Sequence, residues 1–392
     1  NLVLDYIPVA RISDMLLNPG DKFVYDGEHL TYPDIKIVYW CGGNPFHHHQ
    51  DLNKMVEAWQ TPDTVIVHEA WWNANARHAD IIFPMATTLE RNDIGVSRTD
   101  SYFFAMQKAM EPYGDTKTDY EIFTGLAARL GCQSDYTEGR NAQEWLEHMF
   151  DRLRQNAAAL GEEMPSLEEF WEHGYHKFSD PEGVTFMSAF RQDPVVNGLD
   201  TPSGKIEIFS EKIDGFGYED CPGHPVWQEP AEWLGADLTE RFPLHLISNQ
   251  PDTRLHSQYD NGGYSQSNKL KGREPATMNP EDAARRNIED GDAIRLFNDR
   301  GACLSVVKLS DGVMPGVIRL PTGAWFDPLE PGEPGSLDVH GNPNVLTRDA
   351  GTSSLAQGPT AMSTLVQVEK FEGALPPIKI FIPPEVIPEE GL

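Results

Sequence analysis

Residues 38–55 read VYWCGGNPFHHHQDLNKM, and this stretch decides how the first half of the chain folds. A β-rich run, Ile35–Trp40, stops at Cys41-Gly42-Gly43-Asn44-Pro45, and a predicted helix begins at Asp51. In a parallel α/β sheet, ligands bind beyond the carboxyl ends of the strands. Two glycines let a ligand approach the backbone, and Asn44 offers both a donor and an acceptor. The stretch therefore predicts a ligand-binding loop, although a plain turn fits the same residues.

The segments around this loop alternate between strand and helix. Short β-rich runs are predicted at 64–68 and 81–83, and helices at 52–59 and 120–130. This alternation predicts a parallel sheet, because parallel strands need helical crossovers. Residues 141–180 read as helical and acidic, and 201–210 as a turn followed by a strand.

From about Phe242 the pattern changes to short strands with turns between them. They are predicted at 244–248, 293–298, 303–309 and 317–320, with one helix that Asn279 caps and Pro280 begins. Many strands with few helices predict a barrel of six or more strands. The expected fold class is a parallel-sheet α/β domain (1–225, with an acidic helical insertion at about 135–200), followed by a C-terminal β-barrel domain (226–392, with an extended tail).

Composition limits the classes of function. The formal net charge of −30 argues against nucleic-acid binding through phosphate neutralisation. No run of about 18 apolar residues predicts a membrane span. The four cysteines form no CxxC pair, so neither a zinc ribbon nor an iron–sulfur cluster is expected. The chain opens without methionine on an apolar segment, from which we expect a fragment of a longer protein.

Polar residues also end the other predicted strands of the sheet. His68 and Glu69 follow the second strand, and the third leads to ATTLERNDIG at 86–95. The carboxylate of Asp93 could accept hydrogen bonds from the N1–H and N2–H edge of a guanine. A helix-cap or turn aspartate is the alternative reading of the same residue.

The triplet His47-His48-His49 invites a metal-site reading, which the spacing disfavours. Adjacent side chains point in different directions, and no carboxylate or cysteine completes a known ligand set. Hydrogen bonding to phosphate or to neighbouring loops is favoured instead. Cys41 could supply a thiolate, but a packed cysteine is the favoured reading, so no metal ligand is expected in this chain.

Two further polar runs lie in the barrel half, LISNQPDTRLHSQYDN at 246–261 and HGNPNVLTRDAGTSSLAQG at 340–358. Their density of amides and hydroxyls suits a heterocycle with many donors and acceptors, although each run alone also fits a solvated loop. Buried polar groups need partners. We therefore expect the runs 42–50, 248–258 and 340–357 to converge on one cleft between the domains.

Together the motifs resemble one family. GGNPFHHHQDLN, ARHADIIFPMATTLERNDIG, LISNQPDTRLHSQ and HGNPNVLTRDAGTSSLAQG, in this order, are similar to the S- and N-oxide reductase branch of the dimethyl sulfoxide reductase family, which includes dimethyl sulfoxide, trimethylamine N-oxide and biotin sulfoxide reductases. The resemblance covers nearly the whole chain and is weakest over 135–200. It implies a bis(molybdopterin guanine dinucleotide) molybdenum cofactor and oxygen-atom transfer from an S-oxide or N-oxide to molybdenum. PFHHHQDLN leans toward the biotin sulfoxide type.

The resemblance also implies roles for individual residues. Gly43, Asn44 and His48, with His68 or Glu69 and Asp93, would surround a guanosine and its phosphates. His256 would be the residue of this chain nearest the metal, as a positioning group and a proton donor. Further cofactor contacts would come from Ser248, Gln250, Arg254, His256, Ser257, Asn342, Asn344 and Gln357.

One departure from the family pattern matters. The family's serine ligand to molybdenum lies in an N-terminal half that this sequence lacks, so the chain resembles the C-terminal half and is expected to be inactive alone. Its implied partners are that N-terminal half, a small S-oxide or N-oxide and an electron donor such as a cytochrome or another redox protein. The periplasm is slightly favoured, with the cytoplasm as the alternative. A nucleotide-binding module without redox activity, or another molybdopterin oxidoreductase such as a formate dehydrogenase or nitrate reductase, stays open.

Overall fold

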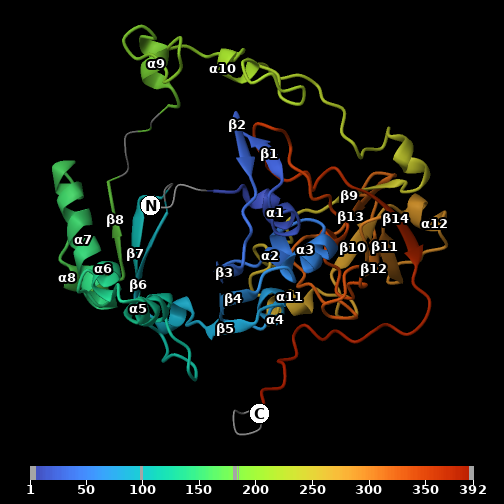
Figure 1. Ribbon diagram of the computed structural model, residues 1–392, viewed down its shortest axis with the longest axis horizontal. Helices are drawn as coiled ribbons and strands as arrows, with labels where there is room; N and C mark the ends of the chain where they lie inside the picture. Colours follow the sequence, from blue (N-terminus) through green and yellow to red (C-terminus); the bar gives the residue numbers. More distant parts are fainter. Residues whose placement is uncertain (1–5, 98–99, 180–182, 184, 388–392) are drawn as a thin grey trace. The chain divides into compact units, whose positions relative to one another are not determined.

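The computed structural model of the chain describes residues 6–97, 100–179, 183 and 185–387 (Figure 1). The chain divides into two compact units. The first comprises Asn1–Val67, Trp71–Ile81 and Ile208–Leu392, and the second comprises His68–Ala70 and Ile82–Glu207. The domain boundary expected at residue 225 stays a prediction.

A three-stranded sheet carries the first polar run. Its strand order is β3–β4–β5, and it lies in a mixed α/β segment with helices between its strands. The loop after the first strand begins this alternation, as the sequence predicted. The elements are β3 (Ile37–Cys41), α2 (Pro45–His48), α3 (Leu52–Trp59), β4 (Thr64–Glu69), α4 (Ala74–Arg77) and β5 (Ile81–Pro84).

Helix α3 forms for reasons that the sequence states. The side chain of Asp51 accepts a hydrogen bond from the backbone nitrogen of Lys54 at 3.2 Å and so caps the first turn. Leu52, Met55 and Trp59 recur at helical spacing and are buried in the hydrophobic core of the first unit. The capping and the apolar stripe together fix the direction in which the chain leaves the histidine triplet. Before it the chain forms η1 (Val9–Arg11), α1 (Ile12–Leu17) and the hairpin of β1 (Lys22–Tyr25) and β2 (Glu28–Thr31).

The later part of the first unit is a closed six-stranded barrel, which confirms the expected fold class (Figure 1). Around the barrel the order is β10–β12–β11–β14–β9–β13, and antiparallel pairing of β13 with β10 closes it. Leu246, Ile294 and Leu296 of the barrel strands are fully buried and belong to the hydrophobic core of the first unit. The strands are β9 (Leu244–Ile247), β10 (Pro275–Met278), β11 (Ala293–Phe297), β12 (Ala302–Leu309), β13 (Val317–Arg319) and β14 (Leu365–Lys370).

Short helices fill the connections of the first unit. Asn279 caps α12 through Glu281, and Pro280 is its first residue, as predicted. Helix α12 comprises Pro280–Ala284. The other helices of this region are α10 (Glu211–Asp214), η3 (Asp237–Glu240), α11 (Gly263–Ser267) and η4 (Pro343–Val345).

The second unit combines a small antiparallel sheet with capped helices. Capping boxes begin three of its α-helices, at Thr118, Asn141 and Ser166, because each cap residue is followed three positions later by glutamate. The elements wholly inside this unit are η2 (Thr88–Glu90), β6 (Asp93–Val96), β7 (Tyr102–Met106), α5 (Asp119–Leu130), α6 (Gln133–Thr137), α7 (Ala142–Ala159), α8 (Leu167–His173), β8 (Tyr175–Lys177) and α9 (Ser188–Gln192).

The strand predicted within 201–210 is wrong, since the structure assigns no strand there. Ile206 and Ile208 alternate with polar residues, but their side chains are 68% and 81% exposed. An isolated alternating run gains nothing from extended pairing unless a neighbouring strand accepts its hydrogen bonds. Among the described residues, no helix combines the length and the apolar character needed to cross a membrane.

Candidate functional site

The loop after β3 is built on two glycines with left-handed backbone. Gly42 and Gly43 both have φ of 76°, a conformation that side chains with a Cβ rarely adopt. The reversal lets Asn44 lead into α2, whose first residue is Pro45. Asn44 and His47 are buried, whereas His48 is exposed. The loop and the helix after it therefore place the amide of Asn44 and the imidazoles of His47 and His49 in the interior of the first unit.

The third polar run docks on this helix. Asn342 donates from Nδ2 to the carbonyl oxygen of Phe46 at 3.0 Å, and Asn344 donates to the carbonyl oxygen of His47. The backbone nitrogen of Asp51 donates to the carbonyl of Thr347 at 3.1 Å. The runs 42–50 and 340–357 thus meet, although 296 residues separate Asn342 from Phe46.

Asn342 and Asn344 also use their side-chain oxygens within the protein. The Oδ1 of Asn342 accepts from the backbone nitrogen of Asn344 at 2.9 Å, and the Oδ1 of Asn344 accepts from the Thr347 hydroxyl at 2.8 Å. Because both amides are buried and bonded at each end, they hold the loop in place. Their predicted role as direct cofactor contacts gains nothing from this geometry.

In the second run, Gln250 holds His256 at two points. Its Oε1 accepts from the backbone nitrogen of His256 at 3.1 Å, and its Nε2 lies 2.9 Å from the ring Nδ1. His256 has a positive φ of 52°. Gly323 lies so close that a Cβ there would collide with the carbonyl oxygen of His256. The loop around His256 is therefore fixed by its own amide and by a glycine that leaves it room.

Arg254 belongs to a buried ion network. Its Nη2 lies 2.9 Å from Glu274 Oε2, and its Nη1 donates to the Ser265 hydroxyl at 3.1 Å. Lys269 lies 2.7 Å from both Asp260 Oδ1 and Glu274 Oε2. Burial opposes the charge of Asp260, but Lys269, His340 and Arg254 hold the pKa of that carboxyl below its ordinary value. The network anchors the loop that carries His256.

A cavity of about 220 Å³ lies beside this loop, lined on one side by Asn249, Thr253 and Arg254. Two further cations, Lys308 and Arg319, come from barrel strands β12 and β13. The carboxylates of Asp252 and Glu274 also line the cavity, and Arg254 pairs with Glu274, so Lys308 and Arg319 are the cations that would attract an anionic ligand. Lys308 and Arg319 were missed in the sequence because each reads as the polar position of an ordinary alternating strand.

Imidazole contacts join the first run to the second. The ring centroids of His47 and His256 are 5.4 Å apart, and those of His48 and His49 are 5.3 Å apart. Burial and the neighbouring His48 and His256 lower the pKa of His47 to about 3. Burial and His48 lower the pKa of His49 to about 4, and burial and His256 also lower the pKa of His48. The imidazoles of His47, His48 and His49 are therefore neutral at pH 7.

Several buried polar atoms around α2 lack a partner within the described part of the chain. They include both side-chain polar atoms of Asn44, both ring nitrogens of His47 and Nε2 of His49. Helix α4 packs on α2 through the rings of Phe46 and His78, 4.3 Å apart, and its Asn75 is likewise unpaired at both ends. An unpaired buried polar group costs about 1–3 kcal/mol, so this cluster is suited to a polar ligand.

His47, His49 and Asn75 were not among the predicted contacts. The Asn-Pro pair was the available signal, because it predicts a helix that begins at Pro45 and turns His47 away from His48. In the described ranges, no three His, Cys, Asp or Glu side chains are placed to hold a metal ion.

The remaining predicted contacts of the first unit lie elsewhere. Gln357 donates from Nε2 to the carbonyl of Val24 at 3.0 Å and so ties its loop to strand β1. The carbonyl of Ser257 accepts from the Trp325 ring nitrogen at 2.8 Å, and Ser248 directly follows β9. None of these observations tests whether the three residues touch a cofactor.

The predicted contacts of the second unit are engaged within it. His68 is buried, with Nδ1 2.7 Å from Asp119 Oδ1, and Glu69 accepts from the backbone nitrogen of Ala70 at 2.9 Å. Asp93 pairs with Arg91 at 2.8 Å and accepts from the nitrogen of Ile94 at 2.8 Å. The turn role of Asp93 is thus seen directly, and its guanine-binding role stays a prediction.

Comparison with known proteins is consistent with this geometry. Residues 9–129 match the family described as molybdopterin oxidoreductase, and residues 244–365 match the molydopterin dinucleotide binding domain. The chain is 46% identical over 383 residues to a dimethyl sulfoxide/trimethylamine N-oxide reductase of Cereibacter sphaeroides, covering 97% of this chain and 46% of that protein.

Two other relatives show the same coverage. A biotin sulfoxide reductase of Cereibacter sphaeroides is 46% identical over 94% of this chain and 49% of its own length. A trimethylamine-N-oxide reductase of Haemophilus influenzae is 44% identical over 97% and 47%. The chain thus spans about half the length of these curated relatives. The solved structure of acetylene hydratase from Pelobacter acetylenicus covers 87% of this chain and 45% of its own with a TM-score of 0.67, and at 20% identity it shows the fold alone.

Proposed function

We propose a function for the chain on the basis of its family. The chain belongs to the dimethyl sulfoxide, trimethylamine N-oxide and biotin sulfoxide reductase family of molybdopterin oxidoreductases. The chain forms the part of such an enzyme that holds a bis(molybdopterin guanine dinucleotide) molybdenum cofactor. The enzyme reduces a small S-oxide or N-oxide. When bound, the cofactor supplies the metal that accepts the oxygen atom and the two electrons that reduce the substrate.

The unpaired buried groups around α2 carry this proposal. Asn44, His47 and Asn75 present donors and acceptors that no other part of the described chain satisfies. A pterin or guanine ring offers ring nitrogens, an amino group and a carbonyl, so it pairs with amides and neutral imidazoles of this kind. The cluster fits an uncharged heterocyclic edge better than a metal ion.

The cavity beside Arg254 supports the anionic part of the same cofactor. Lys308 and Arg319 line it from the barrel strands, and Asn249 lines it from the polar run 248–258. The pyrophosphate of a dinucleotide carries negative charge, which guanidinium and ammonium groups bind with charge-assisted hydrogen bonds. Arg254 itself is neutralised by Asp260 and Glu274, so its part is to position the loop.

His256 is the proposed group of this chain that faces the substrate. The backbone nitrogen of His256 fixes Oε1 of Gln250 as the acceptor, so Nε2 of Gln250 donates to the ring Nδ1. Because Nδ1 accepts this hydrogen bond, the ring N–H lies on Nε2, which can donate a hydrogen bond from an exposed position. By donating this hydrogen bond, His256 can orient the oxygen of an S-oxide or N-oxide.

The proposal also covers the substrate, which belongs to one of three classes, and the partners of the chain. Relatives named for dimethyl sulfoxide, trimethylamine N-oxide and biotin sulfoxide have identities of 44–46%, so identity does not rank them. The rest of the enzyme would supply the metal ligand and cover the cofactor, and a cytochrome or another redox protein would supply electrons. A periplasmic location follows the family pattern, with the cytoplasm as the alternative.

The test is an assay of the protein that carries this chain, purified from a host that makes molybdenum cofactors. We expect a reduced viologen dye to be oxidised when dimethyl sulfoxide, trimethylamine N-oxide or biotin sulfoxide is added. Nitrate reduction or formate oxidation without oxide reduction would assign another branch. Guanine nucleotide without molybdenum or any redox activity would favour a binding module and contradict the proposal.

A further inference from the structure

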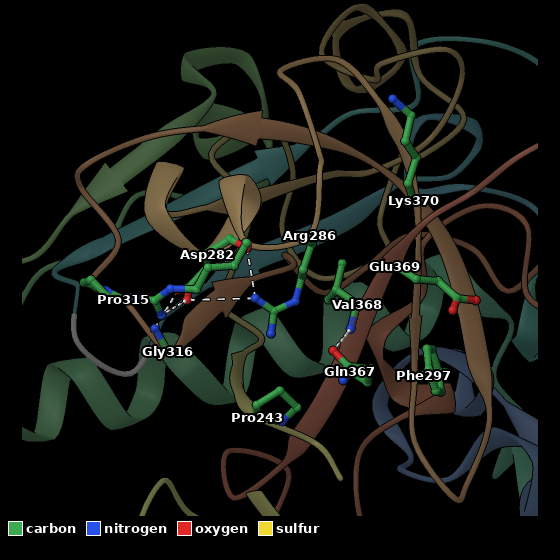
Figure 2. Close-up of a pocket in the computed structure, with 11 residues that line it drawn as sticks. Pro243, Asp282, Arg286, Phe297, Pro315, Gly316, Gln367, Val368, Glu369 and Lys370 are labelled. Carbon is green, nitrogen blue, oxygen red and sulfur yellow. Dashed lines mark hydrogen bonds and ion pairs between the residues drawn. The ribbon is translucent and has the colours of Figure 1, made fainter. Parts of the chain in front are cut away.

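A groove of about 930 Å³ lies on the outer surface of the barrel, where β14 meets α12 and the turn before β13 (Figure 2). Its lining includes Pro243, Arg286 and the second half of β14, Gln367–Lys370. None of these residues belongs to the polar runs around His256. The groove is therefore a feature that the proposed function does not use.

Strand β14 pairs with β9 along its first two residues and with β11 along its last four. It pairs with β9 only at Leu365↔His245 and Val366↔Leu244. Pro243 precedes β9 and has no backbone N–H to continue the ladder. On the opposite side, pairing with β11 runs on to Lys370↔Ile294. The second half of β14 thus has an open edge that faces the groove.

The inter-strand hydrogen bonds show which way the backbone groups of β14 point. Phe371 donates to the carbonyl of Ala293 at 2.9 Å, so the odd-numbered residues of this segment face β11. Thr364 accepts from Leu246 at 2.9 Å, so the even-numbered residues face the β9 side. Val368 and Lys370 therefore direct their backbone groups toward the open edge.

A side chain occupies the place of a missing strand at this edge. The Oε1 of Gln367 accepts the backbone N–H of Val368 at 3.0 Å, as Figure 2 shows. A carboxamide has the same donor and acceptor groups as a peptide bond. Gln367 thus satisfies locally a hydrogen bond that an added strand would otherwise make.

The charge beside the edge favours an acidic occupant. Arg286 extends into the groove between Asp282 and Gln367 (Figure 2), and its side chain is 16% exposed. Its Nη1 donates to the backbone carbonyl of Asp282 at 2.9 Å but lies 3.9 Å from the Asp282 carboxylate, which accepts from the backbone nitrogen of Gly316 at 2.6 Å. A guanidinium without a close carboxylate partner is notable in a chain of net charge −30.

We propose that the open edge of β14 binds an extended acidic segment of a partner polypeptide. The segment pairs with Val368 and Lys370 as an added strand, and one of its carboxylates reaches Arg286. The carboxamide of Gln367 swings out as the segment enters. The alternative is that Gln367 only protects the edge from unwanted pairing, as polar side chains do at other sheet edges.

Two fluorescently labelled, capped octapeptides test the proposal. In one, valine alternates with glutamate, and in the other, valine alternates with lysine. Binding of each peptide to the full chain is measured by fluorescence anisotropy. We expect the glutamate peptide to bind and the lysine peptide not to bind. Arg286→Gln should weaken binding by about tenfold or more, because a charge-assisted hydrogen bond is lost. Gln367→Ala should strengthen binding severalfold, because it removes the competing acceptor. Arg154→Gln, the same change on α7 of the other unit, should leave binding unchanged.

A backbone-blocked peptide separates strand pairing from charge attraction alone. The glutamate peptide with N-methyl groups on alternate residues should lose its affinity, and hydrogen exchange of 366–371 should slow only with the unblocked peptide. The proposal is overturned if neither peptide binds, or if Arg286→Gln and N-methylation leave binding unchanged while thermal unfolding shows each variant folded. It is also overturned if sedimentation experiments show that two copies of the chain associate through the groove.

Discussion

Gln250 contacts His256 at both its backbone and its ring, with Oε1 3.1 Å from the backbone nitrogen and Nε2 2.9 Å from Nδ1. One short side chain therefore sets both the position of the loop and the tautomer of the imidazole. The proton on the outer nitrogen, Nε2, is the property of His256 that the proposed reductase function uses.

Replacing Gln250 by glutamate should reverse this tautomer. A carboxylate still accepts from the backbone nitrogen of His256, but it also accepts from the ring, so the proton moves to Nδ1. Nitrogen-15 spectra of histidine-labelled chain would measure the change. Gln258→Glu, an exposed substitution in the same loop, is the control. A ring that keeps its proton on Nε2 in Gln250→Glu would contradict the account.

Gly323→Ala should displace the loop of His256 or destabilise the first unit. The new Cβ would collide with the carbonyl of His256, and Gly323 has φ of 96°. Gly291→Ala isolates the backbone contribution, because Gly291 has φ of 82° with no atom near the Cβ position. Urea unfolding should show a loss of about 1 kcal/mol for Gly291→Ala and a clearly larger loss for Gly323→Ala. Equal losses would mean that the close approach is unimportant.

Asp93→Asn should lower the guanine content of the purified enzyme while changing stability little. The pair with Arg91 is partly exposed, and such pairs contribute at most about 1 kcal/mol. A carboxylate that binds a guanine edge would lose hydrogen bonds of roughly 1.5–3 kcal/mol each. Guanine per polypeptide, measured after acid release, distinguishes the two roles. Full guanine content in Asp93→Asn, even in mild denaturant, would leave Asp93 as a turn residue only.

Stability of the cofactor-free chain should fall as the pH drops from 7 to 5. Burial lowers the pKa of His47 and His340 to about 3 and that of His49 to about 4, whereas the unfolded imidazoles titrate near 6.5. The unfolded state therefore takes up protons first, and each imidazole removes up to about 2 kcal/mol at pH 5. Urea titrations at both pH values measure the loss, which His340→Gln should reduce. A free energy of unfolding that rises toward pH 5 would contradict this.

The sequence predicted those parts of the fold that depend on local periodicity. Helix α3 follows from the spacing of Leu52, Met55 and Trp59 after Asp51, and the barrel strands from alternation between turns. The strand within 201–210 failed because pairing partners cannot be read from one segment.

For the candidate site, the sequence showed the polar motifs but not the partners of their side chains. In the structure, Asn342 binds the Phe46 carbonyl, and Arg254 binds Asp260 and Glu274. These contacts join residues far apart in the chain, so burial decides which polar groups are already satisfied. Only the folded chain shows that Asn44 and His47 are among the unpaired groups.

Guanine and molybdenum per polypeptide test the central claim most directly. In the protein that carries this chain, we expect two guanines for each molybdenum. Asn44→Leu with His47→Phe should lower both contents severalfold, because the buried partners of the heterocycle are lost. His148→Phe, at a half-buried position on α7 of the other unit, is the control. Guanine and molybdenum contents in the double variant equal to those of the unchanged protein would contradict the account.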